Sequence, residues 1–575
     1  MTEKCACVDY MNRYRLLLSA GIILAGITSL VAQRQFPGKP MDNYRQLKAV
    51  DVMYVLPPMD PLEIESRLLM NEGSHKKPLQ FAIERPVSIS PESHGSWVTQ
   101  DHYRVWRVHI LSPEAYSMGL VFNEYLLEPG VKLFVYDPDQ STIKGAFTSG
   151  NNKSSGILPV GHIEGDELII EMQVPETMTH YGSLYIESVS HAFLDIKHSS
   201  GIAGCPPGEF GCSQVCEIDI NCSDGDDWQL TKKSVVRILT NSQYCTGVLV
   251  NNTAYDGTPY VLTAEHCINK QYIADRSVFL FNYESPSCNG EDGPTSMSIS
   301  GCDSIAVGDS LDFSLVKLSI TPPDSYDVYY AGWDRSDLQT SGTTTIHHPW
   351  GDVKKISFDF EIPSIPAQPG DVPYTDLDDY HYFSYWWIRE WDIGSTEGGS
   401  SGSPLFNAGK RVIGLLSGGI AKCGDSIGYD NENDRVIYNK AFNYDDYYTR
   451  MFYAWDFYGA DGPSLKPWLD PLNTRARSIG GYHPTGTEPS RVVTGTRYSI
   501  YPNPVSDLLH ISSGHSPGGL YSYRVVDISG AVQLSGKMNN GEAGRIDTTP
   551  LAPGIYLIRF EADDYQENHK FIVTR

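Results

Sequence analysis

Short runs of alternating apolar and polar residues recur along the chain, separated by turn-forming residues. In the first third they lie at residues 103–110, 119–122, 131–136 and 167–172. Alternation with a period of two predicts β-strands that bury one face. Glycine (52), tyrosine (36) and proline (36) are plentiful, as expected for many strands joined by tight turns. The pattern therefore predicts a mostly β protein.

One apolar segment near the N-terminus, Leu16–Val31, is longer than these strands and follows the basic residues Arg13 and Arg15. A basic flank, an apolar stretch too short to span a membrane and a small residue, Ala32, are typical of a secretory signal peptide. We assign residues 1–33 to this signal. The strands that follow predict a β-sandwich over residues 34–197, which we interpret as a propeptide. A permanent accessory domain is the alternative.

The composition narrows the class of protein. A length of 575 residues predicts about three to four domains. The net charge of −26 argues against a nucleic-acid partner, which requires basic patches. Eleven cysteines with disulfide-like spacing favour an oxidising compartment outside the cytoplasm. We find no metal-ligand signature and expect no cofactor.

The segment most informative about chemistry is Gly398-Gly399-Ser400-Ser401-Gly402-Ser403-Pro404, which precedes the apolar pair Leu405-Phe406. Small residues let a substrate carbonyl approach the Ser401 hydroxyl. They also free the backbone to direct N–H groups at an oxyanion. Taken alone, such a segment is more often a loop or linker.

Two upstream residues complete a catalytic pattern. His266 follows the apolar strand 260–264 and stands beside Cys267, and histidine suits general-base work near neutral pH. Asp312 precedes the alternating strand 313–318, where a carboxylate could orient an imidazole. Taken alone, His266 could be an ordinary surface histidine and Asp312 an ordinary turn residue. In the order His266, Asp312, Ser401 they predict a Ser-His-Asp hydrolase.

The ordered motifs resemble trypsin-fold serine endopeptidases, and among them the bacterial lysyl endopeptidases, from about Cys216 to Gly481. The matching segments are 216–222, 249–254, 331–335, 346–349, 396–404 and 468–471. The resemblance implies a double β-barrel with the triad between the barrels. It also implies an oxyanion hole from the N–H groups of Gly399 and Ser401.

The resemblance further implies three disulfides, which by motif position are Cys216–Cys423, Cys222–Cys288 and Cys245–Cys267. Spacing alone would leave fifteen ways of pairing six cysteines. Cys205, Cys212 and Cys302 fall outside the pattern, and Cys302 could pair with either of the other two. The His347-His348 pair could be imagined as metal ligands, but a strand-end position is the better interpretation.

Selection of lysine requires a negative charge at the base of the specificity pocket, because a buried ammonium is costly unless paired. The family motif points to Asp446, and the acidic insertion that precedes it offers Asp425 and Asp445 as rivals. Ser417 stands where lysyl enzymes have a histidine, so cleavage after arginine or after either basic residue stays open. Gly418 and Gly419 suit a backbone edge that pairs with an extended substrate.

The C-terminal region, residues 497–575, follows a linker at 482–496. Its hairpins with Asn-Pro, Ser-Gly and Pro-Gly turns predict a small β-sandwich. They resemble the sorting domain of the type IX secretion system of Bacteroidetes-type bacteria. Without the resemblance, the region would be interpreted as a binding module.

The sequence thus predicts a secreted or surface-attached, monomeric serine endopeptidase, with the protease domain at residues 198–481. Its partners would be peptide substrates and the type IX secretion machinery. Lys197–His198 is a candidate self-processing bond. The alternative is a catalytically silent relative that acts as an adhesin, which the intact His266, Asp312 and Ser401 disfavour.

Overall fold

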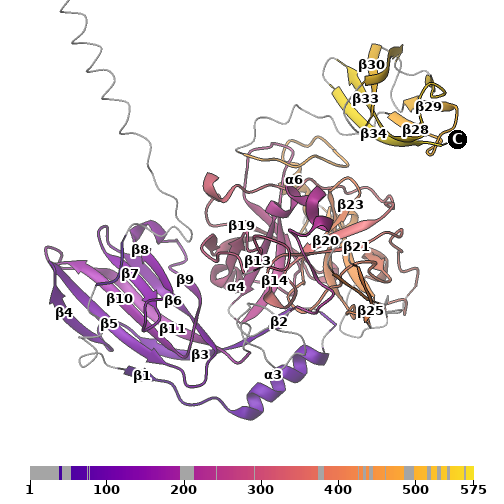
Figure 1. Ribbon diagram of the computed structural model, residues 1–575. Helices are drawn as coiled ribbons and strands as arrows, with labels where there is room; N and C mark the ends of the chain where they lie inside the picture. Colours follow the sequence, from indigo (N-terminus) through magenta and orange to yellow (C-terminus); the bar gives the residue numbers. More distant parts are fainter. Residues whose placement is uncertain are drawn as a thin grey trace, which may run out of the picture.

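The structure is a computed structural model of the whole chain (Figure 1). It describes residues 38–41, 53–73, 75–76, 78–194, 213–240, 242–290, 292–368, 370–372, 381–424, 426–430, 435–438, 445–459, 462–484, 498–513, 520–527, 532–539, 544–562 and 565–574. The predicted signal peptide, the bond Lys197–His198, Cys205, Cys212 and Asp425 lie outside these residues.

Two sheets dominate the first third of the chain, and their facing sides share one buried core. The first sheet has the order β1-β5-β10-β7-β8, with β4 paired to β5, and the second has the order β3-β11-β6-β9. The core includes Val108 and Ile170 from the first sheet and Phe122 and Ile186 from the second. The strands are β1 (Met53–Val55), β3 (Ala82–Ile89), β4 (Ser96–Gln100), β5 (Tyr103–Leu111), β6 (Ser117–Leu127), β7 (Lys132–Tyr136), β8 (Ile143–Phe147), β9 (Leu158–Glu164), β10 (Glu167–Pro175) and β11 (Gly182–Ala192).

The central sheet of eight strands has the order β17-β16-β13-β14-β15-β19-β18, with β2 paired to β14. Most side chains of β13, β14, β15 and β16 are buried, so both faces of these strands are covered. The strands are β2 (Leu79–Gln80), β13 (Val235–Thr240), β14 (Gln243–Val250), β15 (Tyr260–Thr263), β16 (Val278–Phe281), β17 (Ser298–Ser300), β18 (Cys302–Gly308) and β19 (Phe313–Leu318).

The second central sheet has seven strands in the order β12-β21-β20-β23-β24-β27-β22. A shared core joins it to the first central sheet: Leu262 and Leu315 pack in one cluster with Ile346, Phe406 and Leu415. The strands are β12 (Ile218–Asp219), β20 (Thr343–His347), β21 (Lys355–Asp359), β22 (Tyr385–Ile388), β23 (Pro404–Asn407), β24 (Val412–Gly419) and β27 (Asp446–Arg450); β25 (Ser426–Asp430) and β26 (Arg435–Tyr438) form a separate hairpin.

The C-terminal strands form two small sheets, β28-β29-β32 and β31-β30-β33-β34, around a core that includes Leu509, Val525 and Ile558. Their bounds are β28 (Tyr498–Tyr501), β29 (Leu508–Ser513), β30 (Leu520–Asp527), β31 (Val532–Asn539), β32 (Gly544–Asp547), β33 (Gly554–Ala562) and β34 (Tyr565–Val573). The prediction of a mostly β protein is confirmed.

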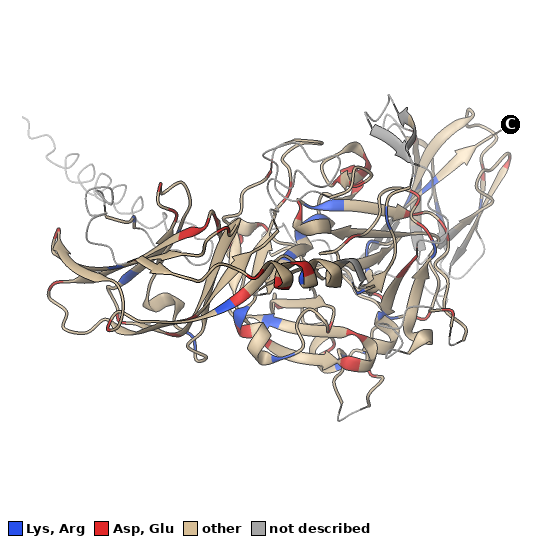
Figure 2. Ribbon diagram, turned by 90° about the horizontal axis from the view of Figure 1, so that it is seen from below, with Lys and Arg blue, Asp and Glu red and all other residues tan. Residues whose placement is uncertain are grey.

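Helices are few and short among the described residues: α3 (Pro61–Gly73), α4 (Gln271–Arg276), α5 (Met451–Ala454) and α6 (Lys466–Leu469). None of the described helices has the length and apolar character needed to cross a membrane. Helix α3 begins at a proline, with Asp60 accepting the Leu62 N–H, as is common at a helix start. Figure 2, seen from the side of α3, shows acidic and basic residues dispersed along the ribbon.

Candidate active site

Ser401 lies in a tight loop, residues 397–403, that leads into β23. We call it the nucleophile loop, after the predicted role of Ser401. Its flanking glycines Gly399 (φ +96°) and Gly402 (φ +77°) adopt left-handed conformations that other residues rarely take. A Cβ atom on Gly402 would lie 2.1 Å from Thr263 Oγ1, so the loop also needs glycine for close packing against β15. The Ser401 carbonyl accepts the Thr246 N–H of the first central sheet, and Ser401 is buried.

His266 and Asp312 come from the ends of two neighbouring strands. Strands β15 and β19 are antiparallel, with Thr263 opposite Ser314, so the residues just beyond this pair lie close together. Asp312 is itself left-handed (φ 49°) and fully buried, at the end of a short 3₁₀ turn. The two predicted partners therefore meet because of the strand register.

The three side chains form a continuous chain of hydrogen bonds. His266 Nε2 lies 2.7 Å from Ser401 Oγ, and His266 Nδ1 lies 3.0 Å from both oxygens of Asp312. Asp312 Oδ1 also accepts the His266 backbone N–H at 3.1 Å. A carboxylate only accepts, so Nδ1 carries the proton and Nε2 is left to accept the Ser401 hydroxyl.

The backbone beside Ser401 offers donors for an anion. Among the described residues, no acceptor takes the N–H of Gly399 or Ser401. The carbonyls of these two residues are both anchored, that of Ser401 by the Thr246 N–H and that of Gly399 by the Thr246 hydroxyl. Thr246 thus holds the loop by bonding the carbonyls of Gly399 and Ser401. The N–H groups of these two residues stay available for the predicted oxyanion hole.

The structure contains the disulfides Cys216–Cys423, Cys222–Cys288 and Cys245–Cys267, the same three pairs that the resemblance implied. Cys245–Cys267 joins β14 to the residue beside His266, so it ties the base to the strand that anchors Ser401. Cys302 is a free, buried thiol whose pKa is raised by burial.

Asp446 is the first residue of β27 and Asp445 immediately precedes it, and the two carboxylates bond different partners. The Asp446 carboxylate is buried and accepts hydrogen bonds from Trp391 Nε1 (2.8 Å) and Thr396 Oγ1 (2.6 Å), and its backbone pairs with Gly419. Thr396 belongs to the segment that leads into the nucleophile loop.

The rival carboxylate lies elsewhere. Asp445 accepts hydrogen bonds from Trp387 Nε1 (2.8 Å) and the Tyr447 hydroxyl (2.9 Å). Of the two, Asp446 is therefore the carboxylate on the nucleophile-loop side of β27.

The remaining predicted substrate-binding residues form the end of β24. The Ser417 hydroxyl is paired with Thr449 Oγ1 at 2.9 Å and so is used within the sheet. Gly418 and Gly419 follow, and Gly419 has a left-handed φ of +151°. A Cβ on Gly419 would lie 2.4 Å from Asp446 Oδ1, so only glycine fits between this edge and the carboxylate.

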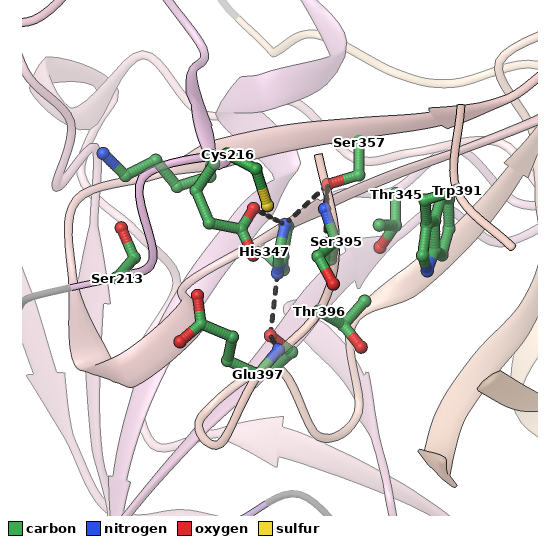
Figure 3. A network of polar contacts seen from close by, with 12 residues as sticks. Ser213, Cys216, Thr345, His347, Ser357, Trp391, Ser395, Thr396 and Glu397 are labelled. Atoms are coloured by element: carbon green, nitrogen blue, oxygen red, sulfur yellow. Dashed lines mark hydrogen bonds and ion pairs between the residues drawn. The ribbon is translucent and has the colours of Figure 1, made fainter. Parts of the chain in front are cut away.

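A second buried network, which the sequence analysis missed, lies on the other side of the nucleophile loop (Figure 3). His347 Nδ1 lies 2.7 Å from Ser400 Oγ, and its Nε2 lies 3.2 Å from Ser357 Oγ and 3.5 Å from Glu217 Oε2. Because Ser357 Oγ donates its own proton to the Ser395 carbonyl, it accepts from His347 Nε2–H, and Nδ1 is left to accept the Ser400 hydroxyl. The residue before Ser401 is thus fixed by a buried histidine.

Glu397, which opens the nucleophile loop, belongs to this network. Burial raises the pKa of the Glu397 carboxyl well above its usual value, and the nearby Glu217 raises it further. The Gln214 N–H donates to Glu397 Oε1 at 2.7 Å. The Glu397 carboxyl therefore favours its protonated form more than an ordinary glutamate does, and its bond from Gln214 joins that segment to the loop.

The histidine pair is structural in this arrangement. The His348 ring is buried and bonds the Asp352 carbonyl through Nδ1 at 2.9 Å. Burial lowers the pKa of His348 well below its usual value. Within the described part of the chain, no group of His, Cys, Asp or Glu residues could hold a metal ion.

Two family models match this chain. Residues 210–436 match the lysyl endopeptidase C-terminal domain, and residues 499–574 match the secretion system C-terminal sorting domain. The resemblance to lysyl endopeptidases and to a sorting domain is confirmed. The sorting domain places the protein among those that are secreted or attached to the cell surface.

A lysyl endopeptidase of Pseudomonas aeruginosa is 26% identical over 289 residues, which cover 47% of this chain. The matched region spans 58% of that protein's length, less than two thirds. Similar solved structures include kallikrein-related peptidase 10 (19% identity, 39% of this chain and 91% of that one, TM-score 0.25) and a Glu endopeptidase (15%, 38% and 85%, TM-score 0.24). A third is the Rv3671c protease of M. tuberculosis (13%, 43% and 89%, TM-score 0.23).

The raised pKa of the Glu397 carboxyl predicts a pH dependence. A carboxyl whose pKa is raised by folding stabilises the protein most at low pH, and this stability is lost as pH rises above its ordinary pKa of 4.5. Glu397→Gln keeps an acceptor for Gln214 and a donor for Glu217 but does not titrate. In a Ser401→Ala background, calorimetry should show the variant melting at the same or a higher temperature than its parent at pH 8. The difference should shrink toward pH 4.

The matched control for this test is Glu114→Gln, an exposed carboxyl in the N-terminal sheets, which should leave the pH profile unchanged. A Glu397→Gln protein that is less stable than its parent at pH 8 would show that the carboxyl is ionised in the folded protein.

Removal of the disulfide beside His266 should loosen the site. Its loop of 22 residues corresponds to about 3 kcal/mol of unfolding free energy. We expect Cys245→Ala/Cys267→Ala to lose an amount of this order in calorimetry or denaturant titration of the Ser401→Ala protein. Cys302→Ala removes a thiol that forms no disulfide and should cost only about 1 kcal/mol. Equal losses in the two variants would contradict the stapling role.

Proposed function

We propose that this protein is a secreted serine endopeptidase that hydrolyses peptide bonds after basic residues, with lysine preferred. The observation that carries the proposal is the hydrogen bond of 2.7 Å between His266 Nε2 and Ser401 Oγ, with Asp312 behind the ring. The matches to the lysyl endopeptidase model and to the Pseudomonas aeruginosa relative support it. The adhesin alternative has no observation in its favour, since all three side chains are present and aligned.

In the proposed mechanism Ser401 is the nucleophile and His266 the general base. As Ser401 Oγ attacks the substrate carbonyl, its proton passes to His266 Nε2, and Asp312 stabilises the imidazolium through Nδ1. The N–H groups of Gly399 and Ser401 hold the negative oxygen. His266 then returns the proton to the leaving amine, and water releases the acyl group by the same steps.

Asp446 is the proposed specificity group. Its carboxylate lies between Thr396 and Gly419, at the wall between the nucleophile loop and the β24 edge. A lysine ammonium entering there would exchange water for a buried negative charge. Trp391 and Thr396 donate to the same carboxylate and orient it without neutralising it.

We also propose the division of the chain that the sequence suggested: signal peptide 1–33, propeptide 34–197, protease 198–481, linker 482–496 and sorting domain 497–575. The first two large sheets lie inside the proposed propeptide, and the two central sheets lie inside the proposed protease, except for β2. The sorting machinery is the expected partner during export.

Ser401→Ala tests the nucleophile. Hydrolysis of a lysine ester by protein processed in its native host should fall by roughly 10⁴–10⁶, while the melting temperature stays near that of the parent. Treatment of the parent with an organophosphate should add one covalent group at Ser401, detected by mass spectrometry. A Ser401→Ala protein with undiminished hydrolysis would refute the proposed mechanism.

Asp446→Asn tests the specificity. Removing one partner of a buried ion pair costs about 3–5 kcal/mol, so kcat/KM for lysine esters should fall by roughly 10²–10⁴. Asp445→Asn is the matched control, because Asp445 is the adjacent residue and its carboxylate bonds Trp387 and Tyr447 instead, so this variant should retain lysine cleavage. The reverse result would transfer the role to Asp445.

A further inference from the structure

One short segment of the proposed propeptide leaves its own sheets and joins the first central sheet. Strand β2 pairs antiparallel with β14, with Leu79 opposite Tyr244 and Gln80 opposite Gln243. The N–H groups of Phe81 and Ala82 continue the contact by donating to the Ser242 carbonyl. On its other side, Gln80 exchanges two hydrogen bonds with the Asn71 side chain of α3. Figure 1 shows β2 beyond the end of α3, at the edge of the central part of the molecule.

The other end of the segment contacts the second central sheet. The Gly419 N–H donates to the His75 carbonyl at 2.7 Å. A Cβ on Gly418 would lie 2.1 Å from the His75 oxygen and 3.1 Å from the Lys76 Cα, so the chain lies directly on the glycine edge. This is the edge at which the sequence analysis expected a substrate backbone.

Between these two anchors the described residues lie beside groups that adjoin the triad. Leu79 lies 3.6 Å from the Cβ position of Gly398, in the nucleophile loop. Lys76 lies near Glu265, the neighbour of His266: burial and Asp312 raise the pKa of Glu265, and the positive charge of Lys76 opposes that rise. The Ser401 side chain has no exposed surface in this arrangement.

We propose that residues 75–76 and 78–80 bind across the active site in the direction and register of a substrate, and so act as a tethered inhibitor. The inference rests on the proposed peptidase function. The N-terminal side of the segment lies on the Gly418–Gly419 edge and the C-terminal side on Tyr244. The nucleophile lies between these two edges, as it would beneath a scissile bond.

The packing of Leu79 assigns a binding preference to the C-terminal side of the cleft. Leu79 is 1% exposed and clusters with Phe81, Tyr244 and the partly buried Trp350. Phe81 in turn stacks on Tyr244, with ring centroids 4.2 Å apart. A peptide substrate with a leucine-like residue on the leaving side would fill the same apolar surface.

The residue types at positions 76–78 suit a substrate-like inhibitor. The single residue between Lys76 and Pro78 is Lys77, which lies outside the described residues, and the bond that follows it precedes a proline. Proline restricts the residue before it, and its nitrogen carries no N–H. A basic residue would make the segment attractive to the pocket, and the proline would make it a poor substrate.

Because the segment belongs to the same chain as the protease, weak contacts suffice to hold it in the cleft. A segment carried by the same chain acts at a high local concentration and competes with substrates without high intrinsic affinity. Catalytic activity then scales with the fraction of molecules in which the segment is released.

The test compares Leu79→Asp with Leu69→Asp in the full chain. Leu69 lies on α3 and is 61% exposed, so its substitution controls for the added charge. In a Ser401→Ala background, hydrogen exchange at Gly419, Phe81 and Ala82 should accelerate roughly tenfold or more for Leu79→Asp alone. With Ser401 intact, hydrolysis of a lysine ester should rise by a similar factor. Asn71→Ala is a milder second variant, and unchanged exchange in β13 verifies that the protease sheets stay folded.

The outcomes separate the two proposals. Equal Gly419 exchange in the parent and Leu79→Asp would overturn the occupation of the cleft. Equal ester hydrolysis by a Ser401-competent parent and its Leu79→Asp variant would overturn the inhibition. Faster exchange without hydrolysis by any form would uphold the occupation and refute the peptidase function instead.

Pro78→Ala tests the register. With Ser401 intact, mass spectrometry should detect a cut between Lys77 and residue 78 in this variant, no such cut in the parent, and none after Ser401→Ala. A variant that hydrolyses the ester but stays uncut at this bond would show that the segment lies out of register.

Discussion

The hydrogen bond between His266 and Ser401 joins groups from different sheets, and the site exists only if both sheets hold their loops in place. Strand β14 does much of this positioning. Cys245 ties it to the residue after His266, and Thr246 anchors the carbonyls of Gly399 and Ser401. Thr263 on β15 donates to the Thr246 carbonyl at 2.8 Å, which joins the strand that precedes His266 to the strand that anchors the Ser401 carbonyl.

The nucleophile loop has a second support, from the opposite side. Ser400 is fixed by His347, and Glu397 accepts the Gln214 N–H. A loop whose N–H groups point toward substrate must have its carbonyls and side chains satisfied elsewhere, since buried polar groups without partners are costly. The two networks meet that requirement on both flanks of Ser401 and keep the donors oriented before a substrate arrives.

Much of this site could be predicted from sequence because its signals are local. Each predicted residue stands beside a recognisable local pattern. Glycines flank Ser401, an apolar strand precedes His266, and an alternating strand follows Asp312. The choice between Asp445 and Asp446 needed the structure, because only the partners of each carboxylate show which one lies beside the loop that carries Ser401. The contacts of Ser400 with His347 and of His75 with Gly419 join residues 53 and 344 positions apart, and no local pattern reports such pairs. The Lys76-Lys77-Pro78 sequence was the one available signal for the inhibitory segment, since it joins basic residues to a proline.

The segment and a substrate would use the same protein groups, and this shared use constrains how inhibition can be tuned. The Gly419 N–H and the Tyr244 edge would bind either ligand, so a change there weakens both and leaves their competition nearly unaltered. Changes at Leu79 or Asn71 alter only the tethered ligand and shift the balance directly. Control of activity is therefore expected to reside in the N-terminal segment and its attachment to α3, where evolution can adjust release without disturbing catalysis. The two hydrogen bonds between Asn71 and Gln80 fit this expectation. They hold β2 extended, and they use no group that a substrate would require.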